Sequence, residues 1–115
     1  MPQLKWRRFG VKTNQKAIDE LVQRIVEIVH PLRIILFGST ARGEMGSESD
    51  IDVLVVMPSG THRRKIAQLL YQEARGIGVS FDIIVATPED LTKHKDNLGL
   101  IYRKVLKEGR DVYVQ

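Results

Sequence analysis

Three short apolar segments are the feature of this chain that most restricts its fold. They read "RIILF" (33–37), "IDVLVV" (51–56) and "VSFDIIVA" (79–86). Each is rich in β-branched residues and bounded by turn-forming residues or proline, and each therefore predicts a β-strand. After Arg33 the first segment is wholly apolar, which is typical of a strand covered on both faces. The chain should fold around a β-sheet with other structure packed on it.

The first helix is predicted before these strands. Apolar residues recur at helical spacing from Gln15 onward, and Thr13 or Asn14 is the expected N-cap. Pro31 should stop this helix, because the residue before a proline avoids the α region. Residues 1–12 are basic and lack a periodic pattern, which predicts a loose N-terminal arm or an edge element.

Further helices are predicted between and after the later strands. Thr61 is the expected cap of a helix that runs to about Arg75. The string "TPED" (87–90) combines an N-cap residue, a proline at the first helical position and acids in the first turn. A last helix, roughly 97–107, precedes a short strand, "DVYV" (111–114). The expected fold class is α/β or α+β, with a small mixed sheet and helices packed on it.

Length and composition limit the class of protein. The 115 residues form one expected domain, 1–115, which is large enough for one core. Eighteen Lys and Arg against fourteen Asp and Glu give a net charge of +4, which suits an anionic partner without identifying one. The sequence has no cysteine and no apolar run near 18 residues. We therefore expect a cytoplasmic protein with no membrane-spanning segment.

Carboxylates stand at the beginning of two of the predicted strands. Asp50 and Asp52 flank Ile51 at the start of the second strand, and Asp82 has the same early position in the third. Asp is a poor strand former, and burying it without a partner costs several kcal/mol or raises its pKa. Side-chain alternation places Asp50 and Asp52 on one face. A helical crossover allows the two strands to run parallel, so all three acids should converge.

A turn rich in Gly and Ser should share this site. Gly38 and Ser39 directly follow the first strand, and the link from there to Asp50 is short. Carboxylate oxygens suit Mg²⁺, and two such ions can support an in-line phosphoryl or nucleotidyl displacement. Backbone N–H groups of a Gly-Ser turn can bind phosphate oxygens, and Arg42 adds a positive charge one helical turn further.

Each of these features also has a simpler interpretation. A single acid at a strand end is usually a solvated cap, and Arg42 can be an ordinary surface charge. The string "GSTARG" is not a P-loop, because Glu44 occupies the position of the lysine. "HRRK" (62–65) is expected to be a solvated helix face rather than an RNA-binding patch. The histidines lack the spacing of metal ligands, and the tyrosines are expected to pack: His30, His62, His94, Tyr71, Tyr102 and Tyr113.

The loop and the acids together resemble a known family. "GS" (38–39), ten residues and "DID" (50–52) match the GS-x10-DxD signature of the DNA polymerase beta-like nucleotidyltransferase superfamily. The string "FGSTARGEMGSESDIDVLVV" looks like the minimal nucleotidyltransferase (MNT) branch, the small partner of HEPN proteins in toxin–antitoxin pairs. Asp82 in "FDIIV" matches the third carboxylate, and "LKEGRDVYV" resembles the usual ending. The resemblance covers roughly 15–114.

This resemblance implies a role for each site residue. Asp50 and Asp52 would bind the metals that hold the triphosphate, and Asp82 would ligate the metal beside the acceptor hydroxyl and help to deprotonate it. Glu44 and Glu48 are assigned no role other than supporting the residues that bind metal and phosphate. The expected cofactors are two Mg²⁺ ions, with Mn²⁺ as an alternative, and the expected substrate is ATP. Phosphate binding is assigned to three residues: Gly38, Ser39 and Arg42.

The same resemblance implies transfer of AMP from ATP to a hydroxyl, a tyrosine of a HEPN toxin, with this chain as the antitoxin. Two alternatives stay open. One is a non-catalytic module that neutralises a toxin by occlusion, and the other is a catalytic subunit that modifies a small molecule or an RNA end. Direct binding to nucleic acid is not expected, and the choice between a homo-oligomer and a hetero-oligomer is open.

Overall fold

All four predicted strands are present. The computed structural model describes residues 10–38, 50–92 and 97–115. The third strand begins at Phe81 rather than at the predicted residue 79, and the last begins at Arg110, one residue before its predicted start. The strands are β1 (Arg33–Phe37), β2 (Ile51–Val56), β3 (Phe81–Ala86) and β4 (Arg110–Val114).

The strands form one mixed sheet in the order β3-β2-β1-β4. Strand β1 is antiparallel to β2 and to β4, whereas β2 and β3 run parallel, as their helical crossover predicts. The three central residues of β1 are buried, which confirms a strand covered on both faces. The antiparallel pairing brings Phe37, the last residue of β1, opposite Asp52.

The first helix is longer than the sequence predicts. Helix α2 (Gly10–Val29) begins before Thr13 and Asn14, so the prediction that one of them caps it is wrong. Residues 10–12 therefore belong to the helix, while 1–9 lie outside the described residues. The helix has a strong amphipathic pattern, and its apolar face packs on the sheet from Ala17 onward.

The remaining helices agree with the predicted segments, with shifted boundaries. Helix α4 (Arg63–Glu73) is capped by His62, not by Thr61: His62 Nδ1 accepts a hydrogen bond from Lys65 N at 3.3 Å. Thr61 Oγ1 instead donates to the carbonyl of Pro58 at 2.7 Å, which closes the preceding turn. The two other helices are α5 (Pro88–Thr92) and α6 (Asn97–Glu108).

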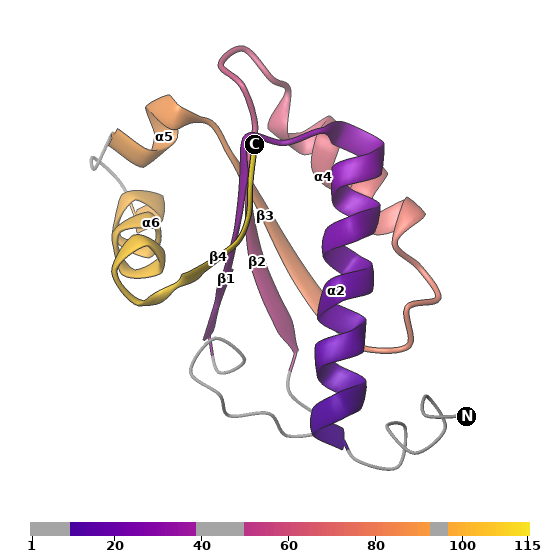
Figure 1. Ribbon diagram of the computed structural model, residues 1–115. Coiled ribbons are helices and arrows are strands. Elements are labelled where there is room, and N and C mark those ends of the chain that lie inside the picture. Colours follow the sequence, from indigo (N-terminus) through magenta and orange to yellow (C-terminus); the bar gives the residue numbers. More distant parts are fainter. Residues whose placement is uncertain (1–9, 39–49, 93–96) are drawn as a thin grey trace.

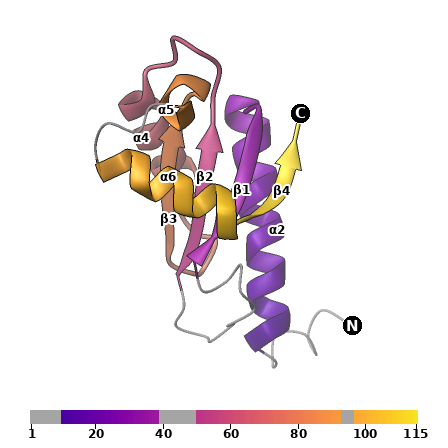
Figure 2. The ribbon, with the colours of Figure 1, turned by 90° about the vertical axis from the view of Figure 1, so that its left-hand side faces the viewer.

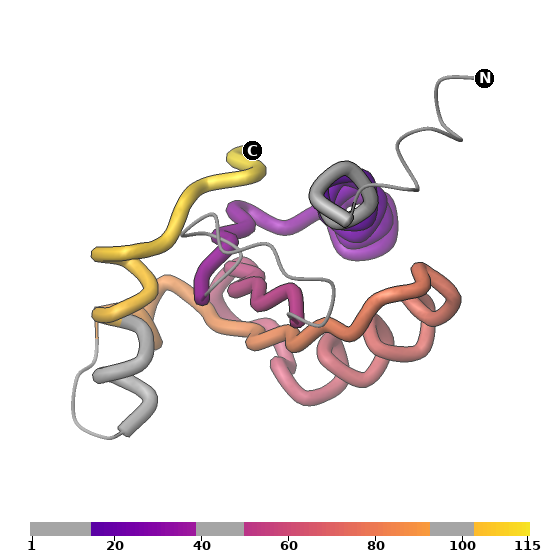
Figure 3. Tube along the Cα trace, turned by 90° about the horizontal axis from the view of Figure 1, so that it is seen from below, coloured from indigo at the N-terminus to yellow at the C-terminus, as the bar shows by residue number. Residues whose placement is uncertain are grey.

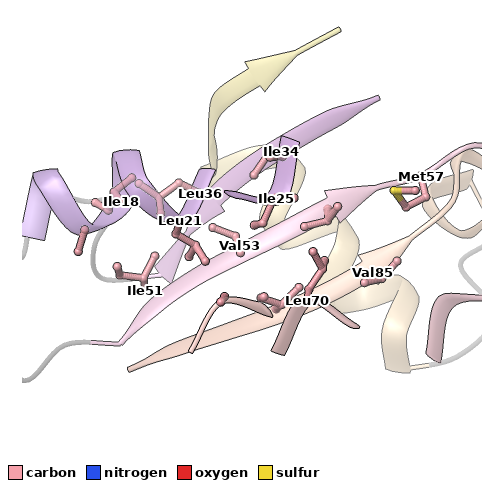
Figure 4. Close-up of a cluster of buried hydrophobic side chains, with 14 residues drawn as sticks. Ile18, Leu21, Ile25, Ile34, Leu36, Ile51, Val53, Met57, Leu70 and Val85 are labelled. Atoms are coloured by element: carbon pink, nitrogen blue, oxygen red, sulfur yellow. The ribbon is translucent and has the colours of Figure 1, made fainter. Parts of the chain in front are cut away.

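The helices cover the two faces of the sheet. Helices α2 and α4 lie on one side of the strands, and α5 and α6 lie on the other (Figures 1 and 3). Figure 4 shows the larger core, in which apolar side chains of α2 and α4 meet those of three strands. Its fully buried members include Leu21, Ile25, Ile34, Leu36, Val53 and Leu70.

A second, smaller core lies on the opposite face. Val105 of α6 and Leu91 of α5 pack there against Ile35, Leu54 and other strand residues. Helix α6 crosses the strands, and the first residues of β2 and β3 extend beyond it (Figure 2). No helix among the described residues is both long and apolar enough to cross a membrane.

Candidate functional site

Two of the predicted acids face each other across the parallel strand pair. Asp52 is the second residue of β2 and Asp82 the second residue of β3, and the two are register partners. Alternation along the strands gives both residues the face of Leu54 and Ile84, which belong to the smaller core. Asp52 is half-buried and Asp82 is exposed. The carboxylates therefore meet at the end of the sheet where β2 and β3 begin.

Gly38 approaches Asp52 from the neighbouring strand. It directly follows β1 and adopts a φ of +77°, a conformation that L side chains rarely adopt. A Cβ atom built on Gly38 would collide with Oδ2 of Asp52 and lie 3.3 Å from its Cγ. Glycine is therefore required here on two counts, and the backbone of the turn after β1 lies directly against the Asp52 carboxylate.

The electrostatics of the site follow from this arrangement. Burial raises the pKa of Asp52, and the nearby charges of Asp82 and then Asp50 raise it further. Asp82 and Asp50 therefore both lie close enough to Asp52 to act on its carboxylate. A site in which carboxylates repel each other is stabilised by any cation that binds between them.

The chemistry of these side chains fits a hard divalent cation, since carboxylate oxygens are the ligands that Mg²⁺ and Mn²⁺ prefer. The described residues do not, however, contain a group of three Asp, Glu or His side chains already gathered closely enough to hold a metal ion. Magnesium also retains water and substrate phosphate oxygens in its shell, so it does not need a cage built from protein alone. The donor set fits, and the substrate would complete the coordination.

The remaining predicted site residues are Asp50 and four residues of the loop that follows Gly38. Asp50 lies exposed immediately before β2. Ser39, Arg42, Glu44 and Glu48 lie outside the described residues.

The contacts of Tyr71 with β3 were not predicted from the sequence. The hydroxyl of Tyr71 on α4 accepts a hydrogen bond from the backbone N–H of Ile83 at 2.8 Å. The ring of Tyr71 also stacks on Phe81, with 5.5 Å between ring centroids. These two contacts fix β3 on either side of Asp82. Packing of Tyr71 was expected, but no sequence signal distinguishes a tyrosine that packs from one that also binds a backbone N–H.

Comparison with known sequences identifies related proteins. The profile of a family described as the nucleotidyltransferase domain matches residues 18–112. A protein of Methanocaldococcus jannaschii, "Putative protein adenylyltransferase MJ0604", is 37% identical over 101 residues, which cover 86% of this chain and 97% of that protein. A second protein of that organism, "Putative protein adenylyltransferase MJ0141", is 33% identical over 78 residues, or 65% of this chain and 63% of its own length.

Solved structures share the fold. A crystal structure of a "putative nucleotidyltransferase" from Sulfolobus solfataricus matches with a TM-score of 0.59 and 21% identity, covering 97% of this chain and 86% of that one. A structure described as "the toxin-antitoxin with AMP-PNP" matches with a TM-score of 0.55 and 22% identity, covering 89% of this chain and 74% of that one. At these identities, the likeness supports the fold class.

Proposed function

The chain belongs to the nucleotidyltransferase domain family, and on this premise we propose that it transfers AMP from ATP to a hydroxyl group of a partner protein. The acceptor is a tyrosine of a HEPN-domain toxin, and the chain is the antitoxin of that pair. Support comes from relatives named as protein adenylyltransferases and from a structural neighbour that is a toxin–antitoxin assembly with AMP-PNP. The HEPN protein is proposed as the partner because residues 15–114 resemble the MNT branch.

The observation that carries this proposal is that the end of β1 lies against the beginning of β2, which is paired with the beginning of β3. Asp52 and Asp82 are register partners, and Gly38 lies so close to Asp52 that no side chain fits between them. A structural role alone does not explain two neighbouring carboxylates that repel each other at the start of a buried strand pair. A nucleotidyltransferase needs this juxtaposition, because the phosphates and the acceptor must meet beside the same carboxylates.

Each residue then has a role in the reaction. The acceptor oxygen attacks the α-phosphorus of ATP, the bond from that phosphorus to the β-phosphate bridging oxygen breaks, and pyrophosphate leaves. Asp82 takes the proton of the acceptor hydroxyl, while Gly38 and Ser39 hold the β- and γ-phosphates and Arg42 adds a further contact. Asp50, Asp52 and Asp82 would hold divalent cations, which when bound offset the charge of the triphosphate and activate the hydroxyl.

The intact masses of both proteins test this proposal. The chain is co-purified with a candidate HEPN partner, ATP and Mg²⁺ are added, and each mass is read before and after. We expect the partner to gain the mass of AMP, and we expect this gain to disappear in Asp52→Asn. A stable complex without any gain would instead favour an antitoxin that acts by occlusion, and would move the search for an acceptor to RNA ends and small molecules.

A further inference from the structure

A groove separates helix α4 from the outer edge of strand β3. Because β3 ends the strand order, one side of its backbone faces away from the sheet. Figure 1 shows α4 running beside this strand. The groove has a volume of about 830 Å³ and is lined by residues of α4, of the turn that follows it and of the start of β3. Its lining includes Arg64, Gln68, Tyr71, Gln72, Arg75 and Phe81.

Two stacked aromatic rings form the floor of the groove. Tyr71 and Phe81 stack with an interplanar angle of 15°, and Tyr71 is 39% exposed. The outward N–H of Ile83 is already bound to the Tyr71 hydroxyl. An incoming chain therefore cannot add to β3 as a fifth strand at this position. Side chains, rather than the strand backbone, must hold whatever binds here.

The wall of the groove is cationic and rich in amide groups. Arg64, Gln68 and Gln72 follow one another at intervals of four residues and so share a face of α4. Arg75 lies in the turn that follows the helix. All four side chains are exposed, and none of the described lining residues is acidic. No carboxylate of the described part of the chain forms an ion pair with Arg64 or Arg75.

The backbone at the end of α4 and in the turn after it is held in place by an arginine of α2. Nη1 of Arg24 on α2 donates hydrogen bonds to the backbone carbonyls of Glu73 and Arg75, at 3.2 and 3.1 Å. The position of the Arg75 backbone is thus fixed while its side chain is exposed. A guanidinium group presented from a fixed backbone binds a carboxylate with less loss of conformational freedom.

From these observations we propose that the groove binds an extended, acidic segment of the protein that receives AMP. The inference rests on the proposed function, because it assumes a protein acceptor. Arg64 lies in the first turn of α4, and Arg75 lies in the turn that follows its last residue, Glu73. The two arginines therefore stand at opposite ends of the helix side of the groove, and both aromatic rings also belong to its lining. A segment with an acid near each end and an apolar side chain between them would meet both arginines and contact the rings.

The position of the groove relative to the site supports this occupant. Phe81 lines the groove, and the next residue, Asp82, presents its carboxylate on the opposite face of the same strand. Because β3 is the edge strand, a polypeptide that leaves the groove beside Phe81 can pass around the edge and bring a hydroxyl to Asp82. Nucleic acid fits less well, because the two rings stack on each other and the charges are separated by amides rather than forming a continuous track.

Binding of defined polymers tests the proposal. The probes are a fluorescent random copolymer of Glu and Tyr, a matching copolymer of Lys and Tyr, and a single-stranded oligoribonucleotide, each titrated by anisotropy without ATP. The groove variant is Arg64→Glu with Arg75→Glu. The matched control is Lys16→Glu with Lys65→Glu, which makes the same change in charge at exposed positions that do not line the groove. ATP affinity is measured in every variant to show that the site is intact.

The expected result is that the Glu-Tyr copolymer binds more tightly than the Lys-Tyr copolymer. Its affinity should fall roughly tenfold further in the groove variant than in the control, since reversal replaces two attractive contacts with repulsive ones. Equal losses in both variants, or no binding of the Glu-Tyr copolymer, would overturn the proposal. A loss confined to the oligoribonucleotide would also overturn it and assign the groove to nucleic acid.

Failure of the groove is distinguishable from failure of the proposed function. Asp52→Asn should bind the Glu-Tyr copolymer as the unmodified chain does, because that residue is not part of the groove. If binding depends on Arg64 and Arg75 while no polypeptide ever gains AMP, the groove stands as a binding site for acidic segments and the adenylyl transfer is wrong. If transfer to the partner occurs equally in the groove variant, the transferase stands and the groove proposal is wrong.

Discussion

Asp52 and Asp82 are direct register partners in the parallel pair of β2 and β3, at the second position of each strand. Side-chain pairs at opposed positions on one face are normally complementary, and like charges there are destabilising. In this protein partial burial, and then the charges of Asp82 and Asp50, hold the pKa of Asp52 above its ordinary value. The arrangement is unfavourable for the empty fold and favourable for a site that receives a cation and phosphates.

Replacement of Asp52 by Asn should therefore separate activity from folding. The change keeps the shape of the side chain and removes its charge, so we expect AMP transfer to be abolished while the fold is retained. The measurement is transfer of labelled AMP to the partner, together with circular dichroism of the variant. Turnover near that of the unmodified chain would show that Asp52 is not a site residue.

The same pair predicts how stability depends on pH. Because the pKa of Asp52 is raised in the folded state, the folded chain binds the proton more tightly than the unfolded chain does. The metal-free protein should thus lose stability as the pH rises from about 4 through the raised pKa, and should stay less stable above it. Asp52→Asn should lack this loss and be the more stable protein at neutral pH. Urea unfolding between pH 4 and 8 checks this, and parallel curves for both proteins would contradict it.

Added Mg²⁺ should oppose that loss in the unmodified chain only. An ion present at a hundred times its dissociation constant stabilises the folded state by about 2.7 kcal/mol. We expect a rise in thermal midpoint with Mg²⁺ at neutral pH, reversal by a chelator, and a much smaller rise in Asp52→Asn. A shift of the same size in both proteins would place the ion elsewhere.

Gly38 offers a test of the contact between the turn and Asp52, with Gly60 as its control. Both glycines have positive φ, but a Cβ on Gly38 meets the Asp52 carboxylate, whereas a Cβ on Gly60 meets nothing within 4 Å. Gly60→Ala should cost roughly 1–2 kcal/mol from backbone strain alone and leave transfer unchanged. Gly38→Ala should cost more and also abolish transfer. Equal effects of the two changes would show that the close approach is unimportant.

Much of this site could be predicted from the sequence because the information was local. Two acids separated by one residue in a strand must share a face, and a helical crossover of this length allows a parallel neighbour. The turn after the first strand was predicted to share the site with the acids, and the structure places Gly38 directly against the Asp52 carboxylate. The match of the nucleotidyltransferase profile to residues 18–112 confirms the family that the loop and acids resemble.

The parts that could not be predicted depend on tertiary contacts. The start of α2 was misplaced because Thr13 and Asn14, residue types that usually mark a cap, lie inside the helix, and residue type alone does not distinguish a cap from an interior position. The choice of His62 over Thr61 as a cap depends on the turn after β2, where Thr61 is already bonded to Pro58. The bond from Ile83 to Tyr71 joins two elements through a single hydroxyl, and nothing in the spacing of the residues indicates it.

Ser39→Ala tests the role of the loop in nucleotide binding. If the hydroxyl donates to a charged phosphate oxygen, its removal should weaken ATP binding by about 1.5–3 kcal/mol. Isothermal titration with a non-hydrolysable ATP analogue measures this loss. An unchanged affinity would mean that the Gly-Ser turn is purely structural.

A final prediction concerns the opposite end of β3, where a substitution should reduce stability and leave AMP transfer unchanged. Asp90 Oδ2 accepts hydrogen bonds from both N and Oγ1 of Thr87, each at 2.9 Å, and lies 3.3 Å from Nη1 of Arg63. In both bonds Thr87 donates and Asp90 accepts, so a first-turn carboxylate holds the start of α5, the segment that "TPED" predicts. Asp90→Ala should reduce the free energy of unfolding by about 1–2 kcal/mol without affecting transfer, because Thr87 follows the far end of the strand from Asp82.

Arg63→Ala is the matched control for Asp90→Ala. It removes only a largely exposed ion pair and should cost less than about 1 kcal/mol. Urea denaturation of both variants makes the comparison. If Arg63→Ala proves as costly as Asp90→Ala, the ion pair to α4 rather than the cap of α5 holds this end of the fold together. If Asp90→Ala instead reduces transfer at full stability, the two ends of β3 are coupled, and the site extends further along the strand than the carboxylate pair.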